Sequence, residues 1–125
     1  MFDQPDIICI VDDDAAVLKA LRRLLRSAGM QTILFEDPRL FLQHAKDHLV
    51  ALAIIDIWMP ELNGLEVQRL LHEIAPSTPA IMMTGRNDPG TNRIALAQGA
   101  VAFFAKPFDD TLFLEAVRGA LPAAS

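Results

Sequence analysis

The stretch IICIVDDD, residues 7 to 14, places three adjacent carboxylates directly after an unbroken apolar run. A short apolar run of this kind is typical of a strand that is buried on both faces, as in a parallel sheet covered by helices. Two like charges about 4 Å apart near a protein surface repel each other by roughly 1 to 4 kcal/mol. We therefore expect a cation to compensate the repulsion at the end of this strand.

The same kind of apolar run recurs along the chain. Runs that predict buried strands lie at residues 51–55, 80–83 and 100–105, and a weaker candidate lies at 31–35. The segments between the runs carry apolar residues at helical spacing. This alternation of strand and helix predicts an α/β fold built on a doubly wound parallel sheet.

Local signals mark the ends of the predicted helices. Gly29 stands where a C-terminal cap belongs, and Pro76 ends the third helix. Asp88 followed by Pro89 is typical of an N-cap and a first helical turn, and Asp109 and Asp110 open the last helix. Asp14, just before the first helical stripe, is interpreted as a cap as well.

Length and composition restrict the class of protein. With 125 residues, 52% apolar and 22% charged, the chain is long enough for one globular core and too short for two. Its apolar runs are far shorter than the roughly 20 residues that span a bilayer, and its start does not resemble a signal peptide, so we expect a cytoplasmic protein that does not bind membranes. Cys9 is the only cysteine and is expected to be a small core residue.

The charge balance argues against a nucleic-acid surface. The formal net charge is −5, whereas such a surface would be basic. Four cations do lie close together in the first helix, at a spacing that places them on its outer face: Lys19, Arg22, Arg23 and Arg26. We interpret them as a solvated face and expect no direct binding of nucleic acid by this domain.

Polar residues follow each of the unbroken runs. Asp12 and Asp13 come after the first strand, Asp56 after the third, Thr84 after the fourth and Lys106 after the fifth. In open parallel sheets the ligand site lies beyond the carboxyl ends of the strands. Each residue alone would be an ordinary turn or loop residue, but their joint position favours one site.

The residue types at this predicted site fit phosphoryl chemistry. Carboxylates without a cation raise one another's pKa, whereas Mg²⁺ takes oxygen ligands such as one or two carboxylates. Lys106 offers a positive charge and Thr84 a hydroxyl, which together can stabilise a dianionic group beside Asp56. A carboxylate can itself attack phosphorus and form an aspartyl phosphate, helped by positioning and charge neutralisation.

Four motifs in order carry a family pattern: VDDD (11–14), DIWMPELNG (56–64), MTG (83–85) and KPF (106–108). With them, the chain resembles the receiver domain of two-component response regulators, and its segments MTGRND and AKPFDD look most like the FixJ branch that commonly precedes a LuxR-type DNA-binding domain. The resemblance covers residues 6–121 and leaves a tail at 122–125. It implies a flavodoxin-like, five-stranded (βα)5 sheet with strand order 2-1-3-4-5.

The resemblance also implies the chemistry of the site. Asp56 would accept a phosphoryl group from the phosphohistidine of a sensor histidine kinase or phosphotransfer protein. Mg²⁺, or Mn²⁺, would be bound by Asp13 and Asp56, by Asp12 mostly through water, and by the backbone carbonyl of Trp58. The domain would catalyse only its own phosphorylation and dephosphorylation and would otherwise not be an enzyme.

Further residues would transmit the signal. Thr84 would bond the phosphoryl group and move inward, Lys106 would pair with a phosphoryl oxygen, and Phe103 would be the aromatic switch. The bond between Lys106 and Pro107 is expected to be cis, and Gly64 to hold a conformation that other residues resist. The switch would act on the face formed by the fourth helix, the fifth strand and the fifth helix, which would form a homodimer or control an output domain or partner, with transcription as the expected output.

Two residues are predicted to modulate the lifetime of the phosphoryl group. Trp58 lies two positions beyond Asp56, where its ring could shield the acyl phosphate from water. Arg86, two positions beyond Thr84, could reach the phosphoryl group or stack on that ring. The alternative for Trp58 is that it merely packs on the loop or meets a partner.

Other functions fit the sequence less well. A phosphohydrolase resembling haloacid dehalogenases would carry its nucleophile after the first strand and would need a cap domain. A flavin carrier of the same topology would need a phosphate loop where VDDD stands. The alternative left open is a pseudo-receiver, a protein-interaction module that acts without phosphorylation, although the full set of acidic, hydroxyl and lysine positions argues against it.

Overall fold

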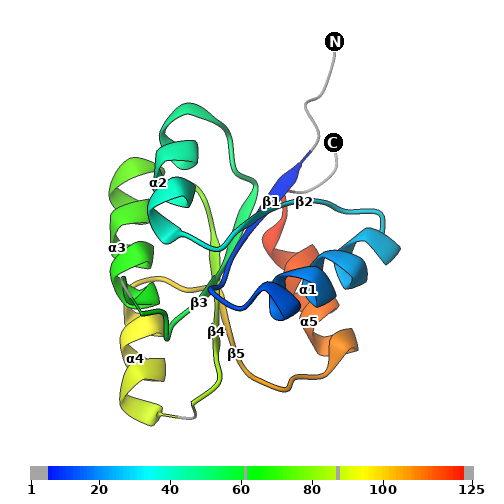
Figure 1. The fold of residues 1–125 in the computed structure, drawn as a ribbon. Helices are drawn as coiled ribbons and strands as arrows, with labels where there is room; N and C mark the ends of the chain where they lie inside the picture. Colours follow the sequence, from blue (N-terminus) through cyan, green and yellow to red (C-terminus); the bar gives the residue numbers. More distant parts are fainter. Residues whose placement is uncertain (1–5, 61, 87, 123–125) are drawn as a thin grey trace.

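The computed structural model describes residues 6–60, 62–86 and 88–122 of the chain, in which strands and helices alternate (Figure 1). In chain order the elements are β1 (Ile7–Val11), α1 (Ala15–Ser27), β2 (Gln31–Phe35), α2 (Pro38–Asp47), β3 (Leu52–Asp56), α3 (Gly64–Ile74), β4 (Ala80–Thr84), α4 (Pro89–Ala97), β5 (Ala102–Ala105) and α5 (Asp110–Ala120). Of the predicted tail, residues 123–125 lie outside the described part. No helix in that part is long and apolar enough to cross a membrane.

The five strands form one parallel sheet in the order β2-β1-β3-β4-β5, which confirms the predicted topology. The fifth strand begins two residues later than the apolar run at 100–105 predicts. The reason is that the Ala100 N–H donates to the Ala95 carbonyl and closes the end of α4, so this part of the run belongs to the turn. Gly99, with φ at 104°, supplies the left-handed conformation that this turn needs.

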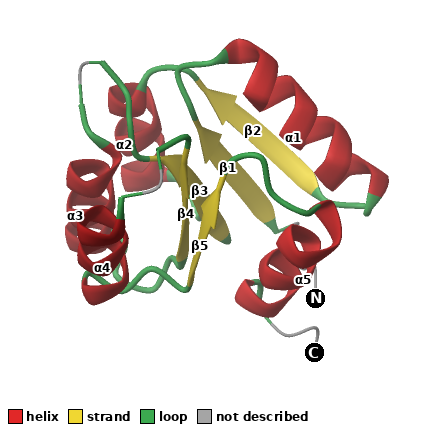
Figure 2. Ribbon diagram, turned by 90° about the horizontal axis from the view of Figure 1, so that it is seen from below, coloured by secondary structure: helices red, strands yellow, loops and turns green. Residues whose placement is uncertain are grey.

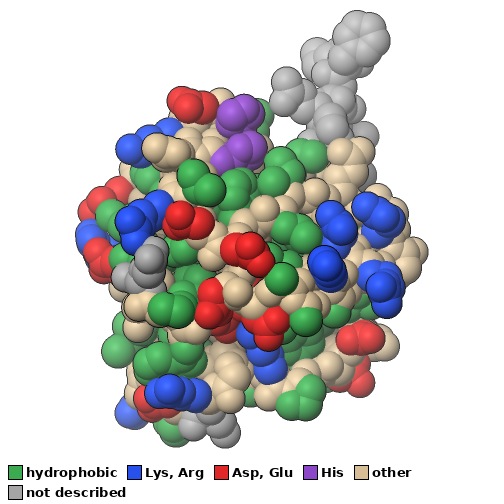
Figure 3. Space-filling model, in the orientation of Figure 1, with side chains coloured by type: hydrophobic (Ala, Val, Ile, Leu, Met, Phe, Trp, Pro, Cys, Tyr) green, Lys and Arg blue, Asp and Glu red, His purple; other side chains and the backbone are tan. Residues whose placement is uncertain are grey.

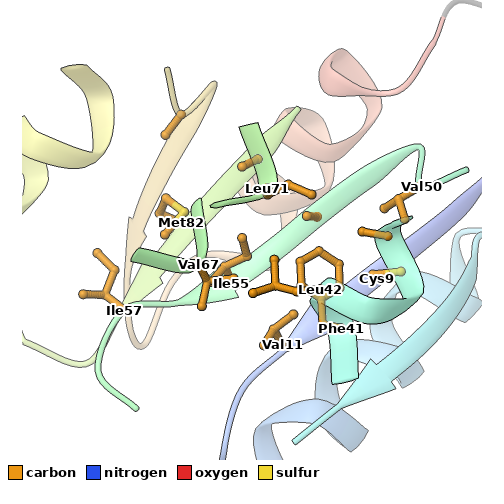
Figure 4. Close-up of a cluster of buried hydrophobic side chains, with 14 of the residues drawn as sticks. Cys9, Val11, Phe41, Leu42, Val50, Ile55, Ile57, Val67, Leu71 and Met82 are labelled. Atoms are coloured by element: carbon orange, nitrogen blue, oxygen red, sulfur yellow. The ribbon is translucent and has the colours of Figure 1, made fainter. Parts of the chain in front are cut away.

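Helices cover both faces of the sheet, α1 and α5 on one side and α2, α3 and α4 on the other (Figures 1 and 2). Successive residues of each strand point to opposite faces and fill two cores. Ile8 and Ile54 pack with the α1 and α5 side chains, whereas Cys9 and Ile55 pack with Phe41 and its neighbours on the other face (Figure 4). Each large apolar side chain buried in this way stabilises the fold by about 1.5 to 3 kcal/mol.

The predicted helix ends are confirmed. Asp14, Asp88 and Asp109 are the N-caps of α1, α4 and α5, and each carboxylate accepts a backbone N–H of the first turn. Gly29 follows the last residues of α1 with φ at 79°. Such caps are worth about 1 kcal/mol each.

The predicted burial of Cys9 and the predicted exposure of the four cations on the first helix are also confirmed. Cys9 is fully buried, and burial raises the pKa of its thiol to about 12. The four cations of the first helix are all exposed, and Lys and Arg side chains gather over α1 in the space-filling view (Figure 3).

Candidate functional site

Three carboxylates meet where β1 and β3 end side by side. The parallel register pairs Val11 with Ile55, so the next residues along the two strands, Asp12 and Asp56, lie at the same edge of the sheet. One ligand oxygen from each of Asp12, Asp13 and Asp56 lies within 4.8 Å of the others. Asp12 and Asp56 are almost completely buried, whereas Asp13 is exposed. Acidic side chains gather accordingly near the centre of the face in Figure 3.

Lys106, the residue after β5, supplies the compensating cation. Its Nζ lies 2.8 Å from Oδ2 of Asp12 and 3.0 Å from Oδ1 of Asp56. Its backbone N–H donates to the Thr84 carbonyl at 2.7 Å, which fixes the start of this loop against β4. The Lys106–Pro107 peptide bond is cis, as predicted. One ammonium group therefore bridges two buried carboxylates that come from different strands.

This single cation does not balance the charge of the site. Burial raises the pKa of Asp56 to about 6, and the hydrogen bond from Lys106 offsets the shift only in part. Burial also raises the pKa of Asp12. Burial alone would lower the pKa of Lys106, but its bonds to Asp12 and Asp56 raise it. The site thus holds more negative charge than its own lysine neutralises, and a further cation would stabilise it.

Thr84, the last residue of β4, is buried at the same edge of the sheet. Its hydroxyl donates to the Arg86 carbonyl at 2.7 Å and accepts the Arg86 N–H at 3.0 Å. Both hydrogen-bonding functions of this hydroxyl are therefore used by the loop that leads into α4. The structure confirms the predicted position of Thr84 and shows that its hydroxyl bonds to that loop.

The sequence profile of the response regulator receiver domain matches residues 8–118, which include all of these residues. The chain belongs to this family. The response regulator protein TodT of Pseudomonas putida is 40% identical over 124 residues, which cover 99% of this chain and 55% of TodT. The transcriptional regulatory protein FixJ of Rhizobium meliloti is 34% identical over 111 residues, which cover 89% of this chain and 54% of FixJ.

A solved receiver has the same fold. The beryllofluoride-activated receiver domain dimer of NtrC4 superposes with a TM-score of 0.88 at 25% identity and covers 92% of this chain and 95% of that one. The chain spans about half the length of the two curated relatives, TodT and FixJ.

The receiver family implies a magnesium ion, and the donor set fits it. Mg²⁺ prefers oxygen ligands and is usually held by one or two carboxylates together with waters and phosphate oxygens. The three clustered carboxylates offer such oxygens, and the exposed Asp13 leaves one side open to solvent. Three carboxylates beside one lysine leave the cluster short of positive charge, which a divalent cation would supply.

Trp58 and Arg86 lie against each other beside the site. The guanidinium carbon of Arg86 is 4.6 Å from the centroid of the Trp58 ring, which is a cation–π contact. Trp58 is half-buried, and its Nε1 is buried without a hydrogen-bond partner among the described residues. Of the two arrangements predicted for Arg86, the receiver shows the stacked one.

Phe103 lies on β5, and Gly64 begins α3. Phe103 is half-buried against the core under α2, α3 and α4, whereas Phe104 packs on Phe113 on the opposite face. The Gly64 N–H donates to the Ile57 carbonyl at 2.7 Å, and a Cβ at this position would overlap the backbone carbonyl of Asp56. The predicted special backbone conformation of Gly64 is therefore wrong, because its φ is not in the left-handed region, and glycine is required here by the close approach of the backbone.

One buried polar residue was missed by the sequence reasoning. Gln68 lies on α3 next to the predicted apolar positions Val67 and Leu71 and is only 4% exposed. A single glutamine beside an apolar stripe gives no sign of its burial, because its partners come from a helix about 27 residues further along the chain.

Proposed function

We propose that this receiver accepts a phosphoryl group on Asp56 from the phosphohistidine of a sensor histidine kinase or phosphotransfer protein, in a Mg²⁺-dependent reaction. The observation that carries the proposal is the meeting of Asp56 with two further carboxylates and Lys106 at the carboxyl edge of the sheet. In this proposal the receiver catalyses only its own phosphorylation and dephosphorylation.

In the transfer, a carboxylate oxygen of Asp56 forms a bond to phosphorus while the bond from phosphorus to the imidazole nitrogen breaks. The imidazole leaves and takes up a proton from solvent. With a pKa of about 6, Asp56 is mostly ionised at neutral pH and can act as the nucleophile. Lys106 moves its ion pair from the carboxylate to a phosphoryl oxygen, which keeps the positive charge where negative charge increases.

The metal would be held by Asp12, Asp13 and Asp56 and by the backbone carbonyl of Trp58. When bound, it supplies positive charge to the phosphoryl oxygens and reduces the repulsion between the incoming group and the acidic residues. Mn²⁺ has the same preference for oxygen ligands and would serve in its place.

The signal would leave the site through Thr84. Its hydroxyl exchanges the Arg86 carbonyl for a phosphoryl oxygen, which draws in the loop before α4, and Phe103 turns into the space that Thr84 leaves. Phosphorylation thereby shifts a pre-existing equilibrium of the face formed by α4, β5 and α5. Ile94, Val101 and Leu112 on these elements or next to them are exposed by half or more, which suits a homodimer contact.

The comparisons support the expected output. The NtrC4 receiver is a dimer in its beryllofluoride-activated form, and FixJ is a transcriptional regulatory protein of which the matched region is about half. We propose that the receiver acts in the cytoplasm, and that it dimerises when phosphorylated and controls an output domain or partner that regulates transcription.

Trp58 and Arg86 would set the lifetime of the phosphoryl group. Trp58 lies two residues beyond Asp56 and stacks on Arg86, and the pair would limit the approach of water to the acyl phosphate. Because the guanidinium is exposed, its contribution to holding the ring is about 0.5 to 1 kcal/mol.

Intrinsic fluorescence offers a direct test, since Trp58 is the only tryptophan and the chain has no tyrosine. Wild type and Asp56→Asn are titrated with Mg²⁺ and then with beryllofluoride, and a parallel sample is treated with acetyl phosphate and examined by intact mass. We expect a response to Mg²⁺, a second response to beryllofluoride, and one added phosphoryl group in wild type only. Mg²⁺ binding without any Asp56-dependent modification, under conditions that modify a control receiver, would favour the phosphorylation-independent interaction module.

A further inference from the structure

Helix α4 is held to the rest of the receiver by little apolar packing. Among its nine residues only Thr91 and Ala95 are buried, and both side chains are small. Its larger apolar residues, Ile94 and Leu96, are half exposed. Apolar stabilisation increases with the area removed from water, so α4 gains little from it. Polar contacts therefore have a larger part in holding α4 in position than in holding the other helices.

The main polar contact of α4 is a bridge of two amide side chains to α3, which lies beside it (Figures 1 and 2). Nε2 of the buried Gln68 donates to the Ala95 carbonyl at 2.9 Å. Nε2 of Gln98, at the end of α4, donates to Oε1 of Gln68 at 2.9 Å and to the Leu65 carbonyl at 3.2 Å. We call this arrangement the Gln68–Gln98 bridge.

The chemistry of the bridge fixes the orientation of both amides. The carbonyls of Ala95 and Leu65 can only accept hydrogen bonds, so each glutamine has to present its NH₂ group to one of them. Gln68 is then left with its oxygen toward Gln98, which donates to it. A glutamate at either position would place a carboxylate oxygen against a carbonyl oxygen, which makes the bridge specific for glutamine.

The opposite end of α4 is tied to the site. The Thr84 hydroxyl holds the backbone of Arg86, and two residues later Asp88 caps α4 by accepting the Gly90 N–H and the Thr91 hydroxyl. Movement of the Thr84 hydroxyl toward Asp56 therefore pulls on the start of α4, while the Gln68–Gln98 bridge holds its end against α3.

We propose that Gln68 and Gln98 are positioning residues that hold α4 in the resting arrangement and so oppose occupation of the phosphoryl site. This inference rests on the function proposed above. By thermodynamic linkage, a contact that stabilises only the resting arrangement lowers the affinity of any phosphoryl mimic that requires the other one. Its removal raises that affinity by the same factor.

The test uses two bridge variants with matched controls. Gln98→Glu reverses the polarity of the half-buried amide, and Gln68→Leu removes the buried amide at similar volume. Gln43, exposed on α2, gives the controls Gln43→Glu and Gln43→Leu. Hydrogen exchange of the α4 amides is measured on the metal-free proteins, and the apparent Kd for beryllofluoride is measured from Trp58 fluorescence at saturating Mg²⁺.

We expect the α4 amides of both bridge variants to exchange at least fivefold faster than in wild type, the size that follows from losing one or two buried hydrogen bonds. Beryllofluoride is expected to bind three- to tenfold more tightly, with no change in the Gln43 controls. Because Gln98→Glu adds a charge and Gln68→Leu does not, agreement between them excludes a charge effect.

Two results would overturn the proposal. Faster exchange with unchanged beryllofluoride affinity would mean that the bridge is only structural, and unchanged exchange would mean that it does not hold α4. If wild type itself fails to bind beryllofluoride at Asp56, the proposed function is wrong, and so is the proposed coupling between the Gln68–Gln98 bridge and the phosphoryl site. The exchange data would still report whether the bridge positions α4.

Discussion

Replacing Asp56 by asparagine is expected to stabilise the metal-free protein at neutral pH. The folded state raises the pKa of this carboxyl from 3.8 to about 6, chiefly through burial. Each unit corresponds to about 1.4 kcal/mol, so ionisation of Asp56 in the folded protein costs about 3 kcal/mol. Asparagine keeps an oxygen for Lys106 and carries no charge. For a domain of this size, a gain of 1 to 3 kcal/mol corresponds to a rise in Tm of about 4 to 10 °C.

The pH dependence distinguishes this cause from others. Because the folded pKa lies above the unfolded value, the folded protein binds the Asp56 proton more tightly than the unfolded chain does. The associated stability is fully present below about pH 4 and is lost as the pH rises through about 6. The advantage of Asp56→Asn should therefore be largest near pH 7.5 and should disappear toward pH 4.

The assay is urea unfolding in the presence of a chelator, followed by circular dichroism at pH 4.5 and at pH 7.5. Glu115→Gln, an exposed carboxylate on α5, makes the same change in net charge and serves as the control. If Asp56→Asn is no more stable than wild type at pH 7.5, or gains as much at pH 4.5, then ionisation of the buried carboxylate is not what destabilises the folded protein.

Three further outcomes are expected. Mg²⁺ at ten times its Kd should stabilise wild type by about 1.4 kcal/mol in thermal unfolding and Asp13→Asn by clearly less, and an equal gain would remove Asp13 from the metal site. Gly64→Ala should destabilise the domain by roughly 3 kcal/mol or more in urea unfolding, because the added Cβ overlaps a backbone carbonyl. The control Gly119→Ala on α5, where nothing lies within 4 Å of the added Cβ, should be neutral or slightly stabilising. Similar changes in the free energy of unfolding for the two variants would contradict the close approach at Gly64. Arg86→Ala should shorten the lifetime of the phosphoryl group two- to fivefold, and Trp58→Asn should shorten it by at least as much. The lifetime is measured by intact mass over time, and an unchanged lifetime would mean that the stacked pair does not shield the site.

Much of the fold and the candidate site follows from the sequence because backbone patterns determine them. Apolar runs without polar interruptions mark strands buried on both faces, and parallel strands end at a common edge. For this reason the sequence predicts that Asp12, Asp56 and Lys106 lie together. The predicted start of β5 lies two residues too early, because an apolar run does not reveal that Ala100 closes a helix.

The contacts made by individual side chains could not be predicted in the same way. The bonds of the Thr84 hydroxyl to Arg86 depend on the path of a loop, and the burial of Gln68 depends on a partner helix. The Thr84 hydroxyl donates to the backbone carbonyl of Arg86, and the Gln68 amide donates to the backbone carbonyl of Ala95. Because every residue type has such a carbonyl, the sequence does not specify which one is used.

The burial of Cys9 makes the native chain convenient for site-specific labelling. Its thiol has a pKa of about 12 and is fully buried, so it reacts with maleimide dyes or spin labels only when the protein unfolds. A single cysteine introduced at the half-exposed Leu96 of α4 would then carry the only label, with no need to remove the natural thiol. Energy transfer from Trp58 to an acceptor at this position would report the displacement of α4 in an otherwise unmodified receiver.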